Sequence, residues 1–231
     1  AFNDTLTASF TNNVMQGGGG NDVYYVNGAV SVVEAVGEGD DEVRTTLTSY
    51  TLANNVERLT YVGTGAFVGK GNAIDNIITG GAGNDTLSGG AGADQFFGAA
   101  GVDRVSYADS TAAITFNLKT GVHSGIAAGD TFDSIEVISG STYSDTFVGD
   151  EAANNFDGST GTDIIDYSTS STAVTVNLTT GTGVGGDAQG DTLAGFEKVI
   201  GSAFNDTLTA SFTNNVMQGG GGNDVYYVNG A

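Results

Sequence analysis

The chain has 231 residues, with 38 glycines and no proline, cysteine or tryptophan, and its 27 acidic residues outnumber six basic ones for a net charge of −21. Six bases are too few for the positive face of a nucleic-acid-binding protein, and zero cysteine excludes disulfide scaffolds and cysteine-ligated zinc. No apolar run approaches the ~18 residues of a membrane span. Hydrophobic residues make up 39% of the chain, enough for a folded core.

Repeats occur at two large scales. Residues 1–29 recur unchanged at residues 203–231, so we expect residues 1–202 to be one repeat unit and residues 203–231 to begin the next identical unit. A single protein with duplicated ends is the alternative. Within the unit, a block at about 98–148 resembles a block at about 158–209, and its offset grows from 60 to 61 residues through one insertion.

The smallest repeat has nine residues, as in GGAGNDTLS at residues 80–88. Its first half is rich in glycine and asparagine, which predicts a tight turn. Its second half offers one apolar residue between polar ones, which predicts a very short strand. The closest copies are residues 17–25, 80–88, 89–97, 98–106 and 219–227; weaker copies are residues 36–44, 140–148, 158–166, 186–194 and 201–209; asparagine replaces the acid in residues 71–79, 149–157 and 210–218.

Two turns and two strands make a coil of about 18 residues that can bury its apolar face only against other coils. We therefore predict an all-β fold, a right-handed parallel β-roll or β-solenoid, with some longer strands at the alternating stretches 113–118 and 173–178. The residues predicted to point inward are Tyr24, Ile78, Leu87, Phe96, Val105, Phe147, Phe156, Ile165, Leu193 and Leu208.

The turns also predict a metal site. Glycine carbonyls and an aspartate at the sixth position are the hard oxygen ligands that Ca²⁺ takes in sets of six to eight. One turn supplies too few, so the turn 18 residues away, on the next coil, is expected to supply the rest. The predicted pairs are Asp85 with Asp103, Asp145 with Asp163, Asp206 with Asp224, Asp4 with Asp22, and the weaker Asn76 with Asp94.

The pattern GGxGxDxUx, with U a large apolar residue, resembles the RTX or hemolysin-type calcium-binding repeats of large bacterial extracellular proteins. The resemblance implies a β-roll, type I secretion to the cell exterior or surface, and folding on meeting several extracellular Ca²⁺ ions. It also implies that position-six aspartates and turn-glycine carbonyls bind these ions. The matching aspartates are Asp22, Asp85, Asp94, Asp103 and Asp224, and less closely Asp41, Asp145, Asp163 and Asp206; the glycines are Gly17, Gly18, Gly20, Gly80, Gly81, Gly83, Gly89, Gly90, Gly92, Gly219, Gly220 and Gly222.

The sequence favours a structural protein over an enzyme. His123 is the only histidine and lies in a turn-like GVHSG stretch without a nucleophile elbow, so no catalytic residue is predicted. The favoured function is a calcium-stabilised segment of a secreted, tandemly repeated adhesin stalk, filament or sheath, continuing into further repeats or self-associating end to end. The alternatives are an export and folding module attached to a secreted enzyme, and an ice- or carbohydrate-binding face.

Overall fold

The computed structural model describes residues 2–8, 12–211 and 214–228, and the fold is all-β. Every strand in this part has three or four residues, and two single 3₁₀ turns interrupt them. Most neighbouring strands are parallel, as a β-roll requires. No helix in the described ranges is long and apolar enough to cross a membrane. By its internal contacts the chain divides into two compact units.

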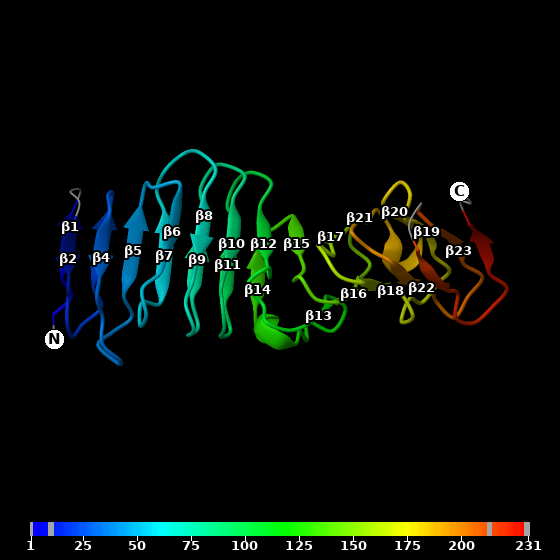
Figure 1. The fold of residues 1–231 in the computed structure, drawn as a ribbon, viewed down its shortest axis with the longest axis horizontal. Helices are drawn as coiled ribbons and strands as arrows, with labels where there is room; N and C mark the ends of the chain where they lie inside the picture. Colours follow the sequence, from blue (N-terminus) through cyan, green and yellow to red (C-terminus); the bar gives the residue numbers. More distant parts are fainter. Residues whose placement is uncertain (1, 9–11, 212–213, 229–231) are drawn as a thin grey trace. The chain divides into compact units, whose positions relative to one another are not determined.

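Unit one comprises residues 1–106 and 126–136. In Figure 1 its strands follow one another from blue to green, each coil beside the previous one. One parallel sheet has the order β1 (Thr5–Ala8), β3 (Val23–Val26), β5 (Glu42–Thr45), β7 (Arg58–Tyr61), β9 (Ile77–Thr79), β11 (Gln95–Phe97) and β14 (Thr131–Asp133). The facing strands are β2 (Asn13–Met15) paired with β4 (Val30–Val32), and the row β6 (Ser49–Thr51), β8 (Val68–Lys70), β10 (Thr86–Ser88) and β12 (Arg104–Ser106).

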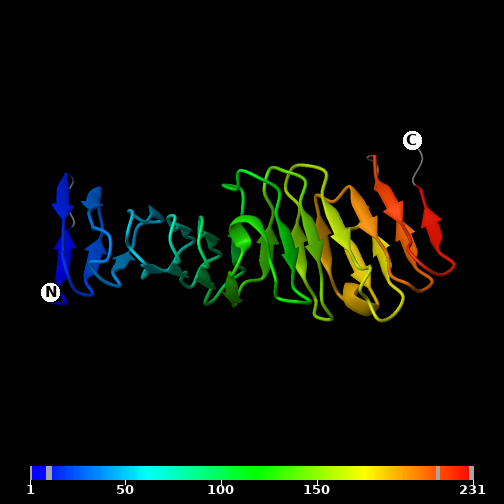
Figure 2. The same cartoon turned by 90° about the horizontal axis from the view of Figure 1, so that it is seen from below.

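Unit two comprises residues 107–125 and 137–231. Figure 2 shows its strands stacked along the chain from green to red. One sheet has the order β13 (Thr115–Asn117), β16 (Thr146–Val148), β18 (Ile164–Asp166), β22 (Lys198–Ile200) and β24 (Val216–Gln218). The facing row is β15 (Val137–Ser139), β17 (Asn155–Asp157), β21 (Thr192–Ala194), β20 (Thr182–Val184), β19 (Thr175–Asn177), β23 (Thr207–Thr209) and β25 (Val225–Tyr227). The 3₁₀ turn η2 (Gly186–Ala188) lies in unit two. The 3₁₀ turn η1 (Gly125–Ala127) begins at residue 125, where the segment 107–125 ends.

The strand register follows the nonapeptide spacing. Leu6 pairs with Tyr24, Ile78 with Phe96, and Phe147 with Ile165, each 18 residues apart. In places a longer connection replaces the 18-residue spacing, and the strands on either side of it still pair. One such connection leaves unit one after residue 106 and returns to it at residue 126. For this reason β11 and β14 pair, Phe96 against Phe132, although 36 residues separate them.

The core is a column built chiefly from the central residue of each short strand, which is buried in most of the strands. All ten residues predicted to point inward are buried. In unit two part of the column is aromatic: the Phe147 ring lies 5.2 Å from that of Phe156 and 5.4 Å from that of Phe196. Strands of three or four residues give little apolar area per coil, so stability depends on stacking many coils.

The expectation of longer strands at residues 113–118 and 173–178 is wrong. These stretches form β13 and β19, each of three residues. β13 is limited at its start because the N–H of Ile114 donates to the carboxylate of Asp145. It is limited at its end because the side chain of Asn117 accepts the N–H of Thr120 and closes a turn.

Replacing a core aromatic tests this packing. Phe147→Ala removes a fully buried ring and is expected to lower the free energy of unfolding by about 3–5 kcal/mol, measured by urea denaturation in saturating calcium. Phe204→Ala is the matched control, because Phe204 is 45% exposed, and we expect its cost to stay within about 0.5 kcal/mol. Equal effects of the two substitutions would contradict the columnar core.

Candidate metal-binding turns

Most strands are directly preceded by an acidic or asparagine residue whose side chain extends the strand ladder. One of its oxygens accepts the backbone N–H of the equivalent residue on the preceding coil. Each pair predicted from the 18-residue spacing is joined in this way. The N···O distances are 2.7 Å for Asp4 to Asp22, 2.8 Å for Asn76 to Asp94, 2.8 Å for Asp85 to Asp103, 2.7 Å for Asp145 to Asp163 and 3.0 Å for Asp206 to Asp224.

The turns that lead to these acids are of two kinds. We call a turn open when the residues at its second and fourth positions both have positive φ. The open turns are residues 17–22, 89–94, 98–103, 158–163 and 219–224. Two of them adopt this shape without glycine at the second position, since Ala99 has φ 74° and Ser159 has φ 73°.

In four of the five open turns the second carboxylate oxygen is buried without a hydrogen bond. Within the described ranges the Oδ2 atoms of Asp22, Asp94, Asp103 and Asp163 are buried and have no partner. Burying an unpaired carboxylate oxygen is costly unless a cation or donor meets it. These atoms are therefore the strongest indication of an ion in the fold.

We call a turn capped when the N–H of its second residue donates to the side chain at its sixth position. In residues 80–85 the N–H of Gly81 donates to Asp85 Oδ2 at 2.6 Å. In residues 140–145 the N–H of Ser141 donates to Asp145 Oδ2 at 2.6 Å, and its hydroxyl donates to the same carboxylate. The other capped turns are residues 71–76, 149–154 and 201–206, and the N–H of Ser211 donates to the side chain of Asn215 in the same way.

Four predicted pairs join a capped turn to the open turn on the next coil. They are Asn76 with Asp94, Asp85 with Asp103, Asp145 with Asp163, and Asp206 with Asp224. The fifth pair joins Asp4 to the open turn that ends at Asp22. In the first three pairs, only the open turn contributes a buried oxygen without a partner.

The glycines in these turns leave space for oxygen atoms. A Cβ on Gly89 would lie 1.8 Å from Asp94 Oδ2, and one on Gly17 would lie 1.9 Å from Asp22 Oδ2. In the open turn 98–103, a Cβ on Gly98 would lie 2.6 Å from Asp103 Oδ2 and 1.9 Å from the carbonyl oxygen of Ser134. Carboxylate and carbonyl oxygens thus converge where a side chain is missing, and this donor set fits Ca²⁺.

The predicted glycines divide between the two kinds of turn. Gly18, Gly20, Gly90, Gly92, Gly220 and Gly222 have positive φ and shape open turns. Gly81 and Gly83 belong to the capped turn 80–85, where the N–H of Gly81 occupies the second carboxylate oxygen of Asp85. Gly80 and Gly219, like Gly17 and Gly89, lie against the carboxylate of their own turn.

Several acids of the same ladder were not among the predicted ligands. Asp130 accepts the N–H of Asp94 at 2.8 Å, and Glu136 accepts that of Asp103 at 2.6 Å. The others are Glu57, Asp191 and Glu197. Four of the five lie 33 to 37 residues from their partners, outside the 18-residue spacing. A sequence pattern could have identified two of them. Asp130 and Asp191 are each followed by threonine and an apolar residue, as Asp85 is.

Three of the open-turn aspartates resist ionisation. Burial raises the pKa of Asp94 to about 7 and that of Asp163 to about 6, and the neighbouring carboxylates Asp130 and Asp145 add to the rise. Burial also raises the pKa of Asp103. A bound divalent cation would reverse this by favouring the ionised form.

His123 has a packing role. Its ring stacks on Phe116 with centroids 4.1 Å apart, and its Nδ1 accepts the N–H of Asn117 at 3.1 Å. Burial lowers the pKa of this imidazole.

Comparison with known proteins agrees with this geometry. The family model of the RTX calcium-binding nonapeptide repeat matches residues 1–28, 70–105, 130–166 and 200–230, together more than half of the chain. The chain is also 46% identical over 85 residues to the endo-1,3-1,4-beta-glycanase ExsH of Rhizobium meliloti. That match covers 36% of this chain and 18% of the glycanase, so the chain spans a small part of that protein.

The raised pKa values predict the pH dependence of the calcium-free fold. The folded state holds protons that the unfolded state, with carboxyl pKa near 4, releases. Stability is therefore greatest at low pH and falls as pH rises through about 7, the pKa of Asp94. Urea denaturation in chelator is expected to give a lower free energy of unfolding at about pH 8 than at about pH 5. Asp94→Asn should flatten this dependence, and stability that rises with pH in chelator would contradict it.

Proposed function

The chain belongs to the RTX calcium-binding repeat family, and we propose that it is a calcium-stabilised structural segment of a secreted, tandemly repeated surface protein or fibre. In this role residues 1–202 form one repeat unit that extends the array. The two identical segments support the proposal, because β1 pairs with β3 as β23 pairs with β25, Leu6 against Tyr24 and Leu208 against Tyr226.

The observation that carries the proposal is the unpartnered second oxygen of the open turns. Each open turn would hold one ion against the preceding coil, with its aspartate as the charged ligand and turn carbonyls completing the shell. Divalent ions would also offset part of the net charge of −21. The capped turns satisfy their own acids and need no ion.

Calcium would then act as a folding switch. Without the ion, carboxylates stacked about 5 Å apart repel one another along the ladder. With it, binding free energy becomes folding free energy. A compartment poor in calcium would keep the chain unfolded for export by type I secretion, and the cell exterior would fold it.

Calcium removal is the direct test. We expect chelation by EGTA to reduce the β-sheet circular dichroism and to lower the free energy of unfolding, and millimolar calcium to restore both, because the unpaired buried acids destabilise the ion-free stack. Magnesium at the same concentration is the control, since its smaller, strictly octahedral shell fits carbonyl-rich turns poorly. An unchanged spectrum in EGTA would contradict the proposal.

A matched pair of variants separates the two kinds of turn. Asp163 and Asp145 lie on adjacent coils, the first in an open turn and the second in a capped one. Asp163→Asn should remove one bound calcium and raise the free energy of unfolding in chelator by about 1–3 kcal/mol, because a buried unpaired charge is lost.

Asp145→Asn should instead leave the number of bound ions unchanged. It loses an acceptor for Ser141 and should cost about 1–3 kcal/mol both with and without calcium. Calcium stoichiometry by equilibrium dialysis and urea denaturation give the two readouts. Loss of an ion in Asp145→Asn but not in Asp163→Asn would reverse the assignment of the turns.

A second candidate function is an export and folding module attached to a secreted enzyme. The match to the R. meliloti glycanase favours it, because that protein is more than five times as long as the matched segment. The coding sequence on either side of these residues distinguishes the two functions. A further copy of the 202-residue unit supports the fibre, and a catalytic domain supports the module.

A further inference from the structure

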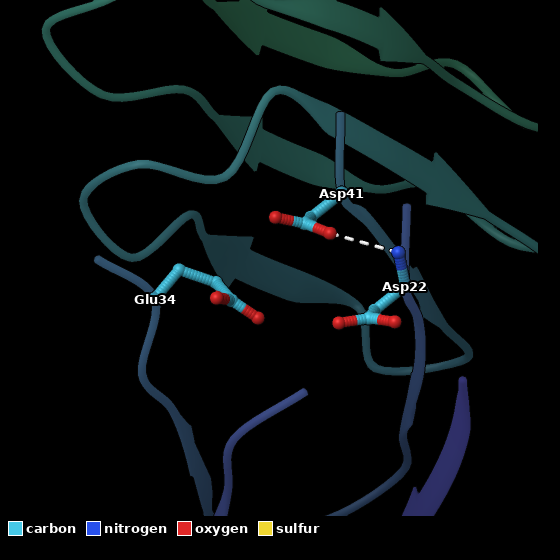
Figure 3. Close-up of side chains that lie close together, drawn as sticks. All are labelled: Asp22, Glu34 and Asp41. Carbon is cyan, nitrogen blue, oxygen red and sulfur yellow. Dashed lines mark hydrogen bonds between the residues drawn. The ribbon is translucent and has the colours of Figure 1, made fainter. Parts of the chain in front are cut away.

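Three carboxylates meet at a point that the nonapeptide pattern does not define. Asp22, Glu34 and Asp41 are 0%, 7% and 1% exposed, and one oxygen from each lies within 4.8 Å of the others. Figure 3 shows the three side chains, with Glu34 directed from its own strand connection toward the two aspartates. Because Ca–O distances are about 2.3–2.6 Å, oxygens around one ion lie no more than about 5 Å apart.

Each of these carboxylates uses one oxygen for a hydrogen bond within the protein. Asp22 Oδ1 accepts the N–H of Asp4 at 2.7 Å, and Asp41 Oδ1 accepts the N–H of Asp22 at 2.8 Å (Figure 3). Glu34 Oε1 accepts the hydroxyl of Tyr24. The remaining oxygen of each carboxylate, Oδ2 or Oε2, is buried without a partner.

Glu34 occupies the place of a turn glycine. Strands β2 and β4 pair in register, Met15 beside Val32. Gly17 lies two residues after β2, and Glu34 lies two residues after β4. Where Gly17 leaves room for the carboxylate of Asp22, the next coil therefore supplies a carboxylate of its own.

We propose that Asp22, Glu34 and Asp41 form a three-carboxylate site for Ca²⁺, in which Glu34 is a ligand contributed from outside the nonapeptides. This inference rests on the proposed function, because it assigns the same cation, calcium, to the site. Glu34 and Asp41 lie outside the segments that the RTX family model matches. Three carboxylates carry more charge than the one expected at an ordinary open turn, so this site binds calcium more tightly than the other sites.

The competing role for Glu34 is a buried acceptor for the Tyr24 hydroxyl, with no ion. The two roles differ in what glutamine would do. An amide oxygen still accepts the Tyr24 hydroxyl, so Glu34→Gln preserves the packing role. It cannot replace the charged oxygen that an ion requires.

The test compares the parent chain, Glu34→Gln and Glu151→Gln, the last removing one exposed acid from a capped turn. Calcium stoichiometry is measured by equilibrium dialysis, and terbium luminescence sensitised by tyrosine reports occupancy beside Tyr24. We expect Glu34→Gln to bind one ion fewer, to lose the tightest binding step and to lose much of the sensitised emission. Glu151→Gln should match the parent in all three, and circular dichroism in calcium should show all three chains folded.

The outcomes separate this inference from the proposed function. An unchanged stoichiometry and tightest step in Glu34→Gln, with calcium still bound elsewhere, would overturn the three-carboxylate site alone. A parent chain that binds no calcium would overturn both proposals. Should Glu34→Gln fail to fold, Glu34→Asp serves instead: it keeps the charge but withdraws the carboxylate by one methylene, and its tightest step should weaken at least tenfold, whereas an undiminished tightest step would overturn the site.

Discussion

The hydrogen bond from a backbone N–H to the carboxylate on the next coil is the interaction on which this fold depends. A three-residue strand makes few ladder bonds of its own, and the acid before it extends the ladder by one step, as Asp103 does for the N–H of Asp85. The bond fixes one oxygen and thereby fixes the direction of the other. In four of the five open turns that second oxygen is buried without a donor. The atoms that set the register are therefore the atoms that create the candidate metal site.

The chain satisfies the second oxygen in two ways, and the difference sets how far the fold depends on an ion. In a capped turn the protein supplies the donor, as Ser141 and Ser202 do with both N–H and hydroxyl. In open turns the N–H groups of Ala91, Ala100 and Gly221 donate to carbonyls of the preceding coil, and the second oxygens of Asp94 and Asp103 have no donor. Where a capped turn precedes an open one, a coil whose acid is fully hydrogen-bonded adjoins a coil whose acid keeps an unpaired oxygen. Such alternation lowers the density of buried oxygens without a donor along each ladder.

The sequence predicted those features that arise from strict nine-residue and eighteen-residue periods. The all-β parallel stack, the ten inward residues and the pairing of Asp145 with Asp163 depend only on equivalent residues lying one coil apart. The sequence did not predict whether a turn is capped or open, because two nearly identical sequences form different turns. GGAGND at residues 80–85 is capped, and GGAGAD at residues 89–94 is open. Excursions that lengthen a coil hid the acids at Asp130 and Glu197, and a substitution at a glycine position hid Glu34. The longer strand predicted at residues 113–118 does not form, because the N–H of Ile114 bonds the carboxylate of Asp145 and the sequence pattern did not reveal that bond.

The duplicated blocks show that the number of residues in a coil can vary. Ile114 donates to Asp145 across 31 residues, and Val174 donates to Asp206 across 32, yet both bonds are 2.8 Å long. The inserted residue is therefore absorbed in the connection, while the bond between coils keeps its length. The same holds for excursions of 33 to 37 residues that end on an acid directly before a strand. Coil length can change because only the residue before each strand must match its neighbour. A column of acids then follows from the architecture itself, and this explains why a chain with a charge of −21 carries so many of its acids inside.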